Sequence, residues 1–534
     1  MSLPDLIQAL LEPSFYPHRP ADVELRQTHI SYVFLAGAEV YKVKKPVRLT
    51  FLDFTTLELR RHFCAEEVRL NRRLAPGVYL GVVGIRREGD GFGLTEESDP
   101  EAIEYAVHMR RLPDERTLER SLLRGEVEAP IVDRLAALLV DFHRGAEVSE
   151  RITANGTPAA ILRVLQDNYA GGEPFHGITI SAEDDAAIEA YARDFLARNE
   201  DLLRRRREQQ QIRDGHADLR AEHVYLTEPP VIVDCVEFKP EFRWCDVASD
   251  LAFLVMDLDY SGRSDLATRL VERYGALAGD AEVARLIPFY ACYRAYVRGK
   301  VESLKSSEEE VGEKERDTAR QSARRHFALS YRYTWSERRA VVAISGLSGT
   351  GKSVLARRMA ERTGYTHVSS DVVRKQLAGL APTERAGGAR HSDLYSGPMS
   401  HRTYDALFGL AGETVRERGV VLDATFQLRQ GRDRARAIAA AAKVPFLLVE
   451  CRCDDVVVGR RLAARARRGD DPSDADWQVY LEQKRRFEGF GTDENRLVLD
   501  TAGDVDALVR TIERELRGLE GGGPPTAARR SSRA

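Results

Sequence analysis

The sequence predicts two folds in one chain of 534 residues, an α+β domain followed by an α/β domain with a parallel sheet. In the first part, β-rich runs come early and helical patterns follow, which is typical of α+β folds. After about residue 335, short apolar strands alternate with helical segments, which favours a parallel sheet with crossover helices. Between the two parts, the charged residues 303–325 predict an exposed helix that leads into a domain junction.

Four segments are predicted from this pattern. They are a strand-rich lobe (1–112), a helical lobe (113–335), the α/β domain (336–518) and a tail (519–534). The composition, 43% hydrophobic and 31% charged, is ordinary for a globular protein. The tail is rich in glycine, proline and charge, so we expect it to be disordered.

Charge and composition exclude several classes of protein. A net charge of −4 gives no general attraction to nucleic acid or anionic lipid. The basic run Arg204–Arg207 falls in a predicted helix, where a solvated face explains it. No apolar run is long enough for a membrane span, and the first residues lack a signal-peptide pattern. The six cysteines are scattered, and Cys451-Arg452-Cys453 has no second pair at zinc spacing. We therefore expect a cytoplasmic protein without membrane partners; its oligomeric state is not predicted.

In the strand-rich lobe, residues 28–35 and 39–44 form a predicted hairpin around a short Ala-Gly-Ala turn. Apolar residues at helical spacing predict a helix over 57–74. Three further strands are predicted over 78–83, 93–95 and 104–109. The helical lobe has predicted helices at 131–143, 158–169, 186–207 and from 250 to about 328.

Between those helices lie the motif His216-x-Asp218 and a predicted strand, 231–238, that contains Asp234. This order, with a hinge near residues 109–112, resembles the aminoglycoside phosphotransferase family, which shares the protein-kinase-like fold. The resemblance covers about residues 20–330. It implies that Asp218 is the base that takes the proton of the acceptor hydroxyl, and that Asp234 binds the metal. It also implies that Lys42 orients phosphates and pairs with Glu67.

Two alternatives and one departure stay open in this lobe. Lys44 has the same strand face as Lys42, because side chains repeat with period two, and Glu66 is an alternative to Glu67. Where the family usually has an asparagine metal ligand, this chain has His223, which suits Mg²⁺ less well. The domain is therefore either a phosphotransferase or a degenerate kinase-like scaffold.

The second domain begins with a strand over 341–345 and a glycine-rich turn that spells G-x-x-x-x-G-K-S, followed by a helix over 352–363. Such a loop presents backbone N–H groups to phosphates, so it predicts ATP and Mg²⁺ binding. Lys352 would reach the β- and γ-phosphates, and the Ser353 hydroxyl would bind Mg²⁺. The predicted nucleotide-binding residues are Gly346, Ser348, Gly349, Thr350, Gly351, Lys352 and Ser353.

The remaining elements of this domain are predicted strands at 367–369, 419–423 and 446–451, and predicted helices at 371–378, 401–418, 431–442 and 454–467. Ligands of parallel sheets bind at the carboxyl ends of the strands. Asp423 follows a strand there and is positioned to help hold Mg²⁺, although an ordinary loop carboxylate is the alternative.

Two further features favour phosphoryl transfer over other P-loop chemistry. Asp371 lies nineteen residues after Lys352, and Arg374 follows Asp371 by one helical turn. This spacing places a base for a hydroxyl group beside a cation that can bind an anionic acceptor. The alternative role for Asp371 is a helix N-cap. Arg461 and Arg465 precede an acidic stretch, 470–475, and predict a basic lid, or else a solvated helix face. Which arginine acts is left open.

These features resemble a family of small P-loop kinases that includes polynucleotide 5′-kinases, gluconate kinases, chloramphenicol phosphotransferases and zeta-type toxins. The resemblance covers about residues 338–515. It implies that Asp371 is the general base and that Arg374 contacts a substrate phosphate. We expect an ATP-dependent phosphotransferase whose acceptor is the hydroxyl of a small molecule or of a nucleic-acid end. An ATP-binding regulatory or scaffold protein is the alternative. Acceptor specificity is expected to depend on the helical lobe and on residues 380–400.

Overall fold

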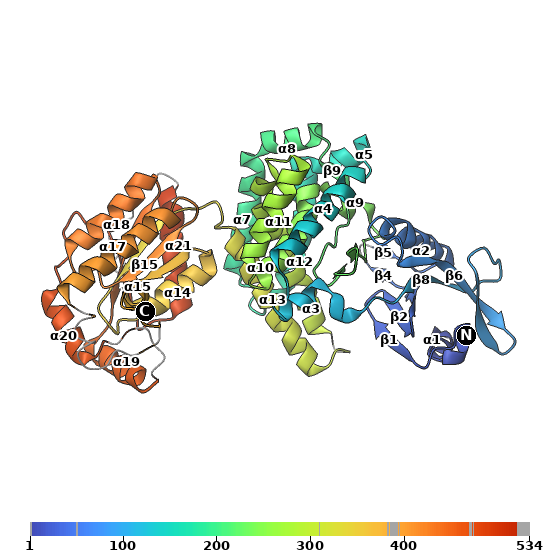
Figure 1. The fold of residues 1–534 in the computed structure, drawn as a ribbon, viewed down its shortest axis with the longest axis horizontal. Helices are drawn as coiled ribbons and strands as arrows, with labels where there is room; N and C mark the ends of the chain where they lie inside the picture. Colours follow the sequence, from blue (N-terminus) through green and yellow to red (C-terminus); the bar gives the residue numbers. More distant parts are fainter. Residues whose placement is uncertain are drawn as a thin grey trace. The chain divides into compact units, whose positions relative to one another are not determined.

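The computed structural model describes residues 3–49, 52–308, 310–381, 384, 394, 396–468, 473 and 475–520. The chain divides into two compact units, Met1–Ser330 and Tyr331–Ala534 (Figure 1). The predicted specificity loop, acidic stretch and tail lie largely outside the described residues. The predicted combination of a two-lobed α+β domain and an α/β domain with a parallel sheet is confirmed.

The first lobe is a six-stranded antiparallel sheet with the order β1-β2-β3-β8-β6-β7. Its helix α2 (Leu57–Asn71) is N-capped by Thr56 and packs Cys64 and Val68 against β8 residues such as Val107. The bounds of the other elements are α1 Leu3–Leu10, β1 Val23–Gln27, β2 Ser31–Ala36, β3 Glu39–Lys44, β4 Arg48–Leu49, β5 Leu52–Asp53, β6 Tyr79–Glu88, β7 Gly91–Glu96 and β8 Glu104–Arg110.

The second lobe is helical, and its centre is α10 (Val247–Tyr260), which packs between α11 (Ser264–Ala278) and α12 (Val283–Ser307). Nearly every side chain of α10 is buried. The other helices are α3 Leu118–Leu123, α4 Ala129–Gly145, α5 Glu150–Thr153, α6 Pro158–Ala170, α7 Ala182–Arg198, α8 Glu200–Glu208, α9 Pro240–Arg243 and α13 Glu313–Tyr333. The short strands are β9 Ile212–Asp214, β10 Val224–Tyr225, β11 Val231–Ile232 and β12 Trp244–Asp246.

Three predicted elements of this lobe were wrong in extent. The helix over 186–207 is two helices, because the chain leaves helical geometry at Asn199. The strand over 231–238 is only Val231–Ile232, and Asp234 has a left-handed backbone with a φ of 64°. The charged helix over 303–325 is interrupted after Ser307 and resumes at Glu313, and its residues Ser303 and Ala323 are buried.

The prediction that Arg204–Arg207 forms a solvated face was wrong for Arg206. Its side chain is completely buried, whereas Arg204 is exposed. Arg206 donates to both carboxylate oxygens of Asp246, at 2.9 and 2.7 Å, and to Asp280 at 2.5 Å. A guanidinium tolerates burial when carboxylates satisfy its donors in this way.

The second unit contains a five-stranded parallel sheet with the order β14-β15-β13-β16-β17. Helices α17 and α18 pack on each other on one side of it, and α14 and α21 on the other (Figure 1). The strands are β13 Val341–Ser345, β14 Thr366–Ser369, β15 Val420–Ala424, β16 Phe446–Arg452 and β17 Leu497–Asp500. The helices are α14 Lys352–Thr363, α15 Ser370–Leu377, α17 Gly397–Thr414, α18 Arg429–Ala442, α19 Asp455–Arg468, α20 Trp477–Arg486 and α21 Val505–Glu520. Within the described part of the chain, no helix has the length and apolar character needed to cross a membrane.

Candidate active sites

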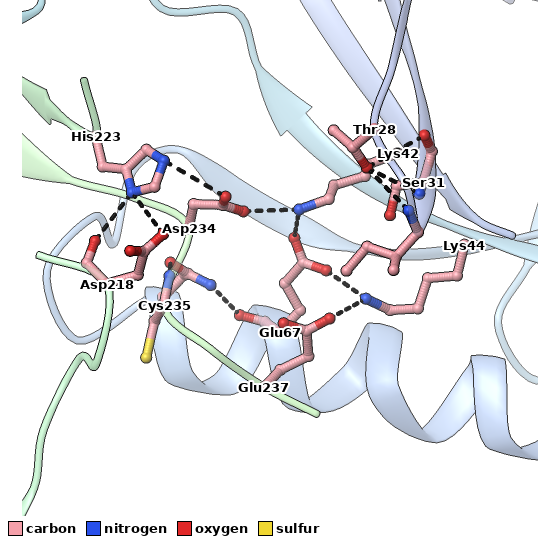
Figure 2. Close-up of polar contacts among 12 residues, drawn as sticks. Thr28, Ser31, Lys42, Lys44, Glu67, Asp218, His223, Asp234, Cys235 and Glu237 are labelled. Carbon is pink, nitrogen blue, oxygen red and sulfur yellow. Dashed lines mark hydrogen bonds and ion pairs between the residues drawn. The ribbon is translucent and has the colours of Figure 1, made fainter. Parts of the chain in front are cut away.

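A cluster of lysines and carboxylates joins the two lobes of the first unit (Figure 2). Lys42 Nζ on β3 lies 2.9 Å from Glu67 Oε1 on α2 and 2.7 Å from Asp234 Oδ1. Burial lowers the pKa of Lys42, but Asp234 and Glu67 outweigh burial and hold that pKa well above its ordinary value. Burial raises the pKa of Asp234, and the charge of Lys42 more than reverses this effect. These shifts, with the lowered pKa of Glu67, favour the charged forms of Lys42, Glu67 and Asp234 at neutral pH.

The alternatives Lys44 and Glu66 are resolved differently by the structure. Lys44 is completely buried and contacts both Glu67, at 2.7 Å, and Glu237. Glu66 points away from the lysines and pairs with Arg69 at 2.7 Å. Glu67 is thus shared by two lysines, and of these two only Lys42 also contacts Asp234 in the described structure.

His223 lies between Asp218, the predicted base, and Asp234, the predicted metal ligand (Figure 2). Its Nδ1 is 3.0 Å from the carbonyl oxygen of Asp218 and 3.5 Å from the Asp218 carboxylate. Its Nε2 is 3.7 Å from Asp234 Oδ2. The structure therefore brings Lys42, Glu67, Asp218, His223 and Asp234 into one site. Over the described residues, however, no group of three or more His, Cys, Asp or Glu side chains is arranged to hold a metal ion.

Asp250 on α10 holds the backbone next to Asp218 and was missed by the sequence analysis. Its buried carboxylate accepts hydrogen bonds from the N–H groups of His216 and Ala217, both at 2.8 Å, and lies 3.1 Å from His143 Nε2. Ala217 has a left-handed backbone with a φ of 70°. These hydrogen bonds stabilise a backbone conformation that residues other than glycine rarely adopt. The helix also carries Asp257 and Asp259, so its sequence alone does not single out Asp250.

In the second unit, the glycine-rich turn follows β13 and leads into α14, which begins at Lys352. Gly351 has a φ of 90°, in the left-handed region that favours glycine. A Cβ at Gly346 would lie 2.6 Å from Thr350 Oγ1, so the loop also needs glycine there. Every predicted nucleotide-binding residue from Gly346 to Ser353 belongs to this one loop and the first turn of α14.

Asp423 lies beside the loop, in register with Ile344 of β13 and with Ser369 of β14. Burial raises the pKa of Asp423, but His367, Lys352 and Ser353 outweigh burial and hold that pKa below its ordinary value. Its Oδ2 is 3.3 Å from His367 Nε2, a neighbour that the sequence analysis missed. Its Oδ1 is buried and has no hydrogen-bond partner among the described residues. A buried carboxylate oxygen without a donor, next to Ser353, fits a bound Mg²⁺.

Asp371 and Arg374 form the predicted pair on α15, with Arg374 Nη1 2.6 Å from Asp371 Oδ1. The N-cap position of that helix is Ser369, so Asp371 does not occupy it. Ser369, the last residue of β14, is in register with Asp423. The Asp371–Arg374 pair comes just after Ser369, so it lies at the carboxyl edge of the sheet, as the phosphate loop does.

The two predicted lid arginines differ in position. Arg461 Nη2 donates to the Thr501 carbonyl at 2.6 Å, and its Nη1 would lie 3.0 Å from a Cβ at Gly351. Arg465 donates instead to the carbonyl of Ala475, at the start of the segment before α20. Arg461 therefore packs against the phosphate loop, whereas Arg465 holds a neighbouring segment.

Gln483 on α20 was also missed, and it occupies part of the phosphate loop. The Ser348 N–H, one of the amides expected to face phosphate, donates to Gln483 Oε1 at 2.9 Å. No local pattern predicts this contact, because the two residues are far apart in the chain.

We expect Gln483→Ala to tighten nucleotide binding by about 2- to 10-fold, because an amide hydrogen bond of about 0.5–1.5 kcal/mol no longer competes with phosphate. Titration of the full chain with Mg·ATP by calorimetry measures this. Gln478→Ala, an exposed glutamine on the same helix, should leave affinity unchanged. Weaker binding in Gln483→Ala would instead show that Gln483 contacts the nucleotide.

The folds and sites define a tandem of a two-lobed, kinase-like domain and a P-loop nucleotide-binding domain. The family model described as an AAA domain matches residues 341–490. Uncharacterized protein Rv2004c of Mycobacterium tuberculosis is 33% identical over 491 residues, which cover 91% of this chain and 94% of that protein. Uncharacterized protein Mb2027c of Mycobacterium bovis matches to the same extent. The chain belongs to the family of these mycobacterial proteins.

Solved structures align with parts of the chain at low similarity. A choline/ethanolamine kinase family protein from Mesorhizobium loti covers 61% of this chain and 98% of its own, at 13% identity and a TM-score of 0.36. A gluconokinase from Sinorhizobium meliloti covers 35% of this chain and 100% of its own, at 19% identity and a TM-score of 0.25.

Proposed function

We propose that this protein is an ATP-dependent phosphotransferase whose second unit transfers the γ-phosphoryl group to a hydroxyl acceptor. The observation that carries the proposal is the Asp371–Arg374 pair at the same sheet edge as the phosphate loop. A motor ATPase or a GTPase switch binds no separate acceptor, so it needs neither a base for an acceptor hydroxyl nor a cation for an anionic group of that acceptor.

The predicted site residues of the second unit have separate roles in this reaction. Lys352, buried at the start of α14, neutralises charge on the β- and γ-phosphates. Ser353 and Asp423 Oδ1 would hold Mg²⁺, which when bound neutralises phosphate charge. Arg461, against the loop, adds positive charge for the transferring group.

Asp371 takes the proton of the acceptor hydroxyl, and Arg374 orients Asp371 and faces an anionic group of the acceptor. An acceptor with a phosphate or carboxylate beside its hydroxyl suits this pair. A nucleic-acid end and a small phosphorylated or acidic metabolite both have that chemistry.

We propose that the first unit holds a second phosphotransferase site. Asp218 would be its base and Lys42 would bind the phosphates of ATP. Asp234 and His223 would bind the metal ion. One observation favours the alternative, a nucleotide-binding scaffold. Asp234 is already paired with Lys42 at 2.7 Å, so both groups must exchange partners before either can serve Mg·ATP.

Transfer of label from γ-labelled ATP tests the proposal. The full chain is incubated with Mg²⁺ and pools of 5′-hydroxyl oligonucleotides, sugars, acidic metabolites and aminoglycosides. We expect one pool to take label. If the second unit is responsible, the Asp218→Asn variant should transfer label to that pool at the same rate. Label found only in inorganic phosphate with every pool would contradict a phosphotransferase and favour the regulatory alternative.

A further inference from the structure

One cavity of the first unit continues from the Lys42–Asp234 cluster into the helical lobe. Its volume is about 1080 Å³, and Lys42, Asp218 and Asp234 line one end. Pockets for a single small ligand typically measure about 300–1,000 Å³. The cavity therefore has room for a second ligand beyond a nucleotide, next to the predicted base Asp218.

The end away from Lys42 is mainly apolar. Its walls are helices α6, α10 and α12 and the segment around β12. The residues that form them include Ile161, Val164, Trp244, Phe253, Val297 and Val301. All of these side chains except the buried Phe253 are half-buried. Covering such a surface with an apolar, ring-bearing ligand is favourable by about 25 cal/mol per Å².

Two arginines line the same cavity close to the base. Arg220 lies two residues after Asp218, and Arg298 lies on α12. Burial lowers the pKa of Arg220, and the charge of Arg298 lowers it further, whereas Asp257 and Asp218 act in the opposite direction. The Nε atoms of both side chains are buried and find no hydrogen-bond acceptor in the part of the chain that the structure describes.

The other ends of both guanidiniums are anchored. Arg298 Nη2 donates to Glu302 at 2.6 Å, and Arg220 Nη1 donates to Glu222. Such anchors hold both guanidiniums in place before a ligand arrives. One helical turn before Arg298, Arg294 donates to the carbonyl of Ala217 at 3.2 Å. Helix α12 therefore holds both the chain next to the base and one of the cations.

We propose that this part of the cavity binds the phosphoryl acceptor of the first unit, a hydroxyl compound with an apolar, ring-bearing body and an anionic group. Arg220 and Arg298 bind the carboxylate or phosphate of that compound, and the walls of α6 and α12 cover its apolar body. This assignment rests on the proposed phosphotransferase activity of the first unit.

Two fluorescent probes that differ in one anionic group test the site without any turnover. 8-Anilinonaphthalene-1-sulfonate has an aromatic body and a sulfonate, and N-phenyl-1-naphthylamine has the same rings without the charge. With the full chain, we expect Arg298→Gln to weaken sulfonate-probe binding by about 10- to 100-fold, as for other lost charge-assisted hydrogen bonds. Binding of the neutral probe should stay within about twofold of the unchanged chain, because the apolar walls are intact.

Controls separate the site from general effects. Arg285→Gln, an exposed arginine on the same helix, should leave both probes unaffected. Arg298→Lys should recover part of the sulfonate affinity, and Arg220→Gln should repeat the loss if Arg298→Gln fails to fold. The proposal is overturned if the sulfonate probe does not bind, or if both probes weaken equally. Because no ATP is present, a failure of label transfer in the pools leaves this result readable.

Discussion

Replacing Asp371 with asparagine is expected to lower the rate of phosphoryl transfer by the second unit by about 10²–10⁴-fold, the usual contribution of a general base. Asparagine keeps the shape of the side chain, and its Oδ1 can still accept the hydrogen bond that Arg374 Nη1 makes at 2.6 Å. It cannot take a proton from a hydroxyl. The variant therefore removes the chemistry and preserves the local geometry.

The rate is measured with Mg·ATP and the acceptor pool that takes label, alongside nucleotide affinity. Affinity should not change, because Asp371 lies on α15 and outside the phosphate loop. Asp433→Asn, which alters an exposed aspartate that pairs with Arg429 on α18, is the matched control and should keep full activity. If Asp371→Asn transfers phosphate at the unaltered rate, Asp371 is not the base.

The parts of the site that the sequence predicted are those whose chemistry is local in the chain. The phosphate loop needs glycine, lysine and serine within eight residues, so its whole function is written in one stretch. Asp371 and Arg374 are one helical turn apart, and they pair because i and i+3 side chains lie on one face. Period two in β3 likewise put Lys44 beside Lys42, and both reach Glu67.

The parts that the sequence did not predict depend on contacts between distant segments. Gln483 meets Ser348 only because α20 packs against the phosphate loop. Asp250 meets His216 only because α10 packs against the chain around His216 and Ala217, and nothing local distinguishes Asp250 from the other aspartates of that helix. Arg206 looked like its neighbours Arg204 and Arg205, and only the fold supplies its two carboxylates. A single sequence gives the residue type at such positions but not its partner.

Arg206→Met is expected to destabilise the first unit by about 3–5 kcal/mol, the usual loss when one member of a buried ion pair is removed. Methionine fills much of the same space but leaves the buried carboxylates of Asp246 and Asp280 without their donor. Arg204→Met, on the same helix, is the matched control. Arg204 is exposed and bonded only to Asp201 and Glu208 in the described structure, so its loss should cost less than about 1 kcal/mol.

The two variants are compared by urea unfolding of the full chain, in which the unfolding transition of the first unit is monitored. Asp246 also caps α10 by accepting from the Ala248 N–H at 2.8 Å, and α10 holds the chain next to Asp218 through Asp250. Arg206→Met should therefore also weaken any activity that depends on Asp218, at urea concentrations where the unit is still folded. Equal unfolding midpoints for Arg206→Met and Arg204→Met would show that the buried pair contributes no stability, since only the first variant leaves carboxylates buried and unpaired.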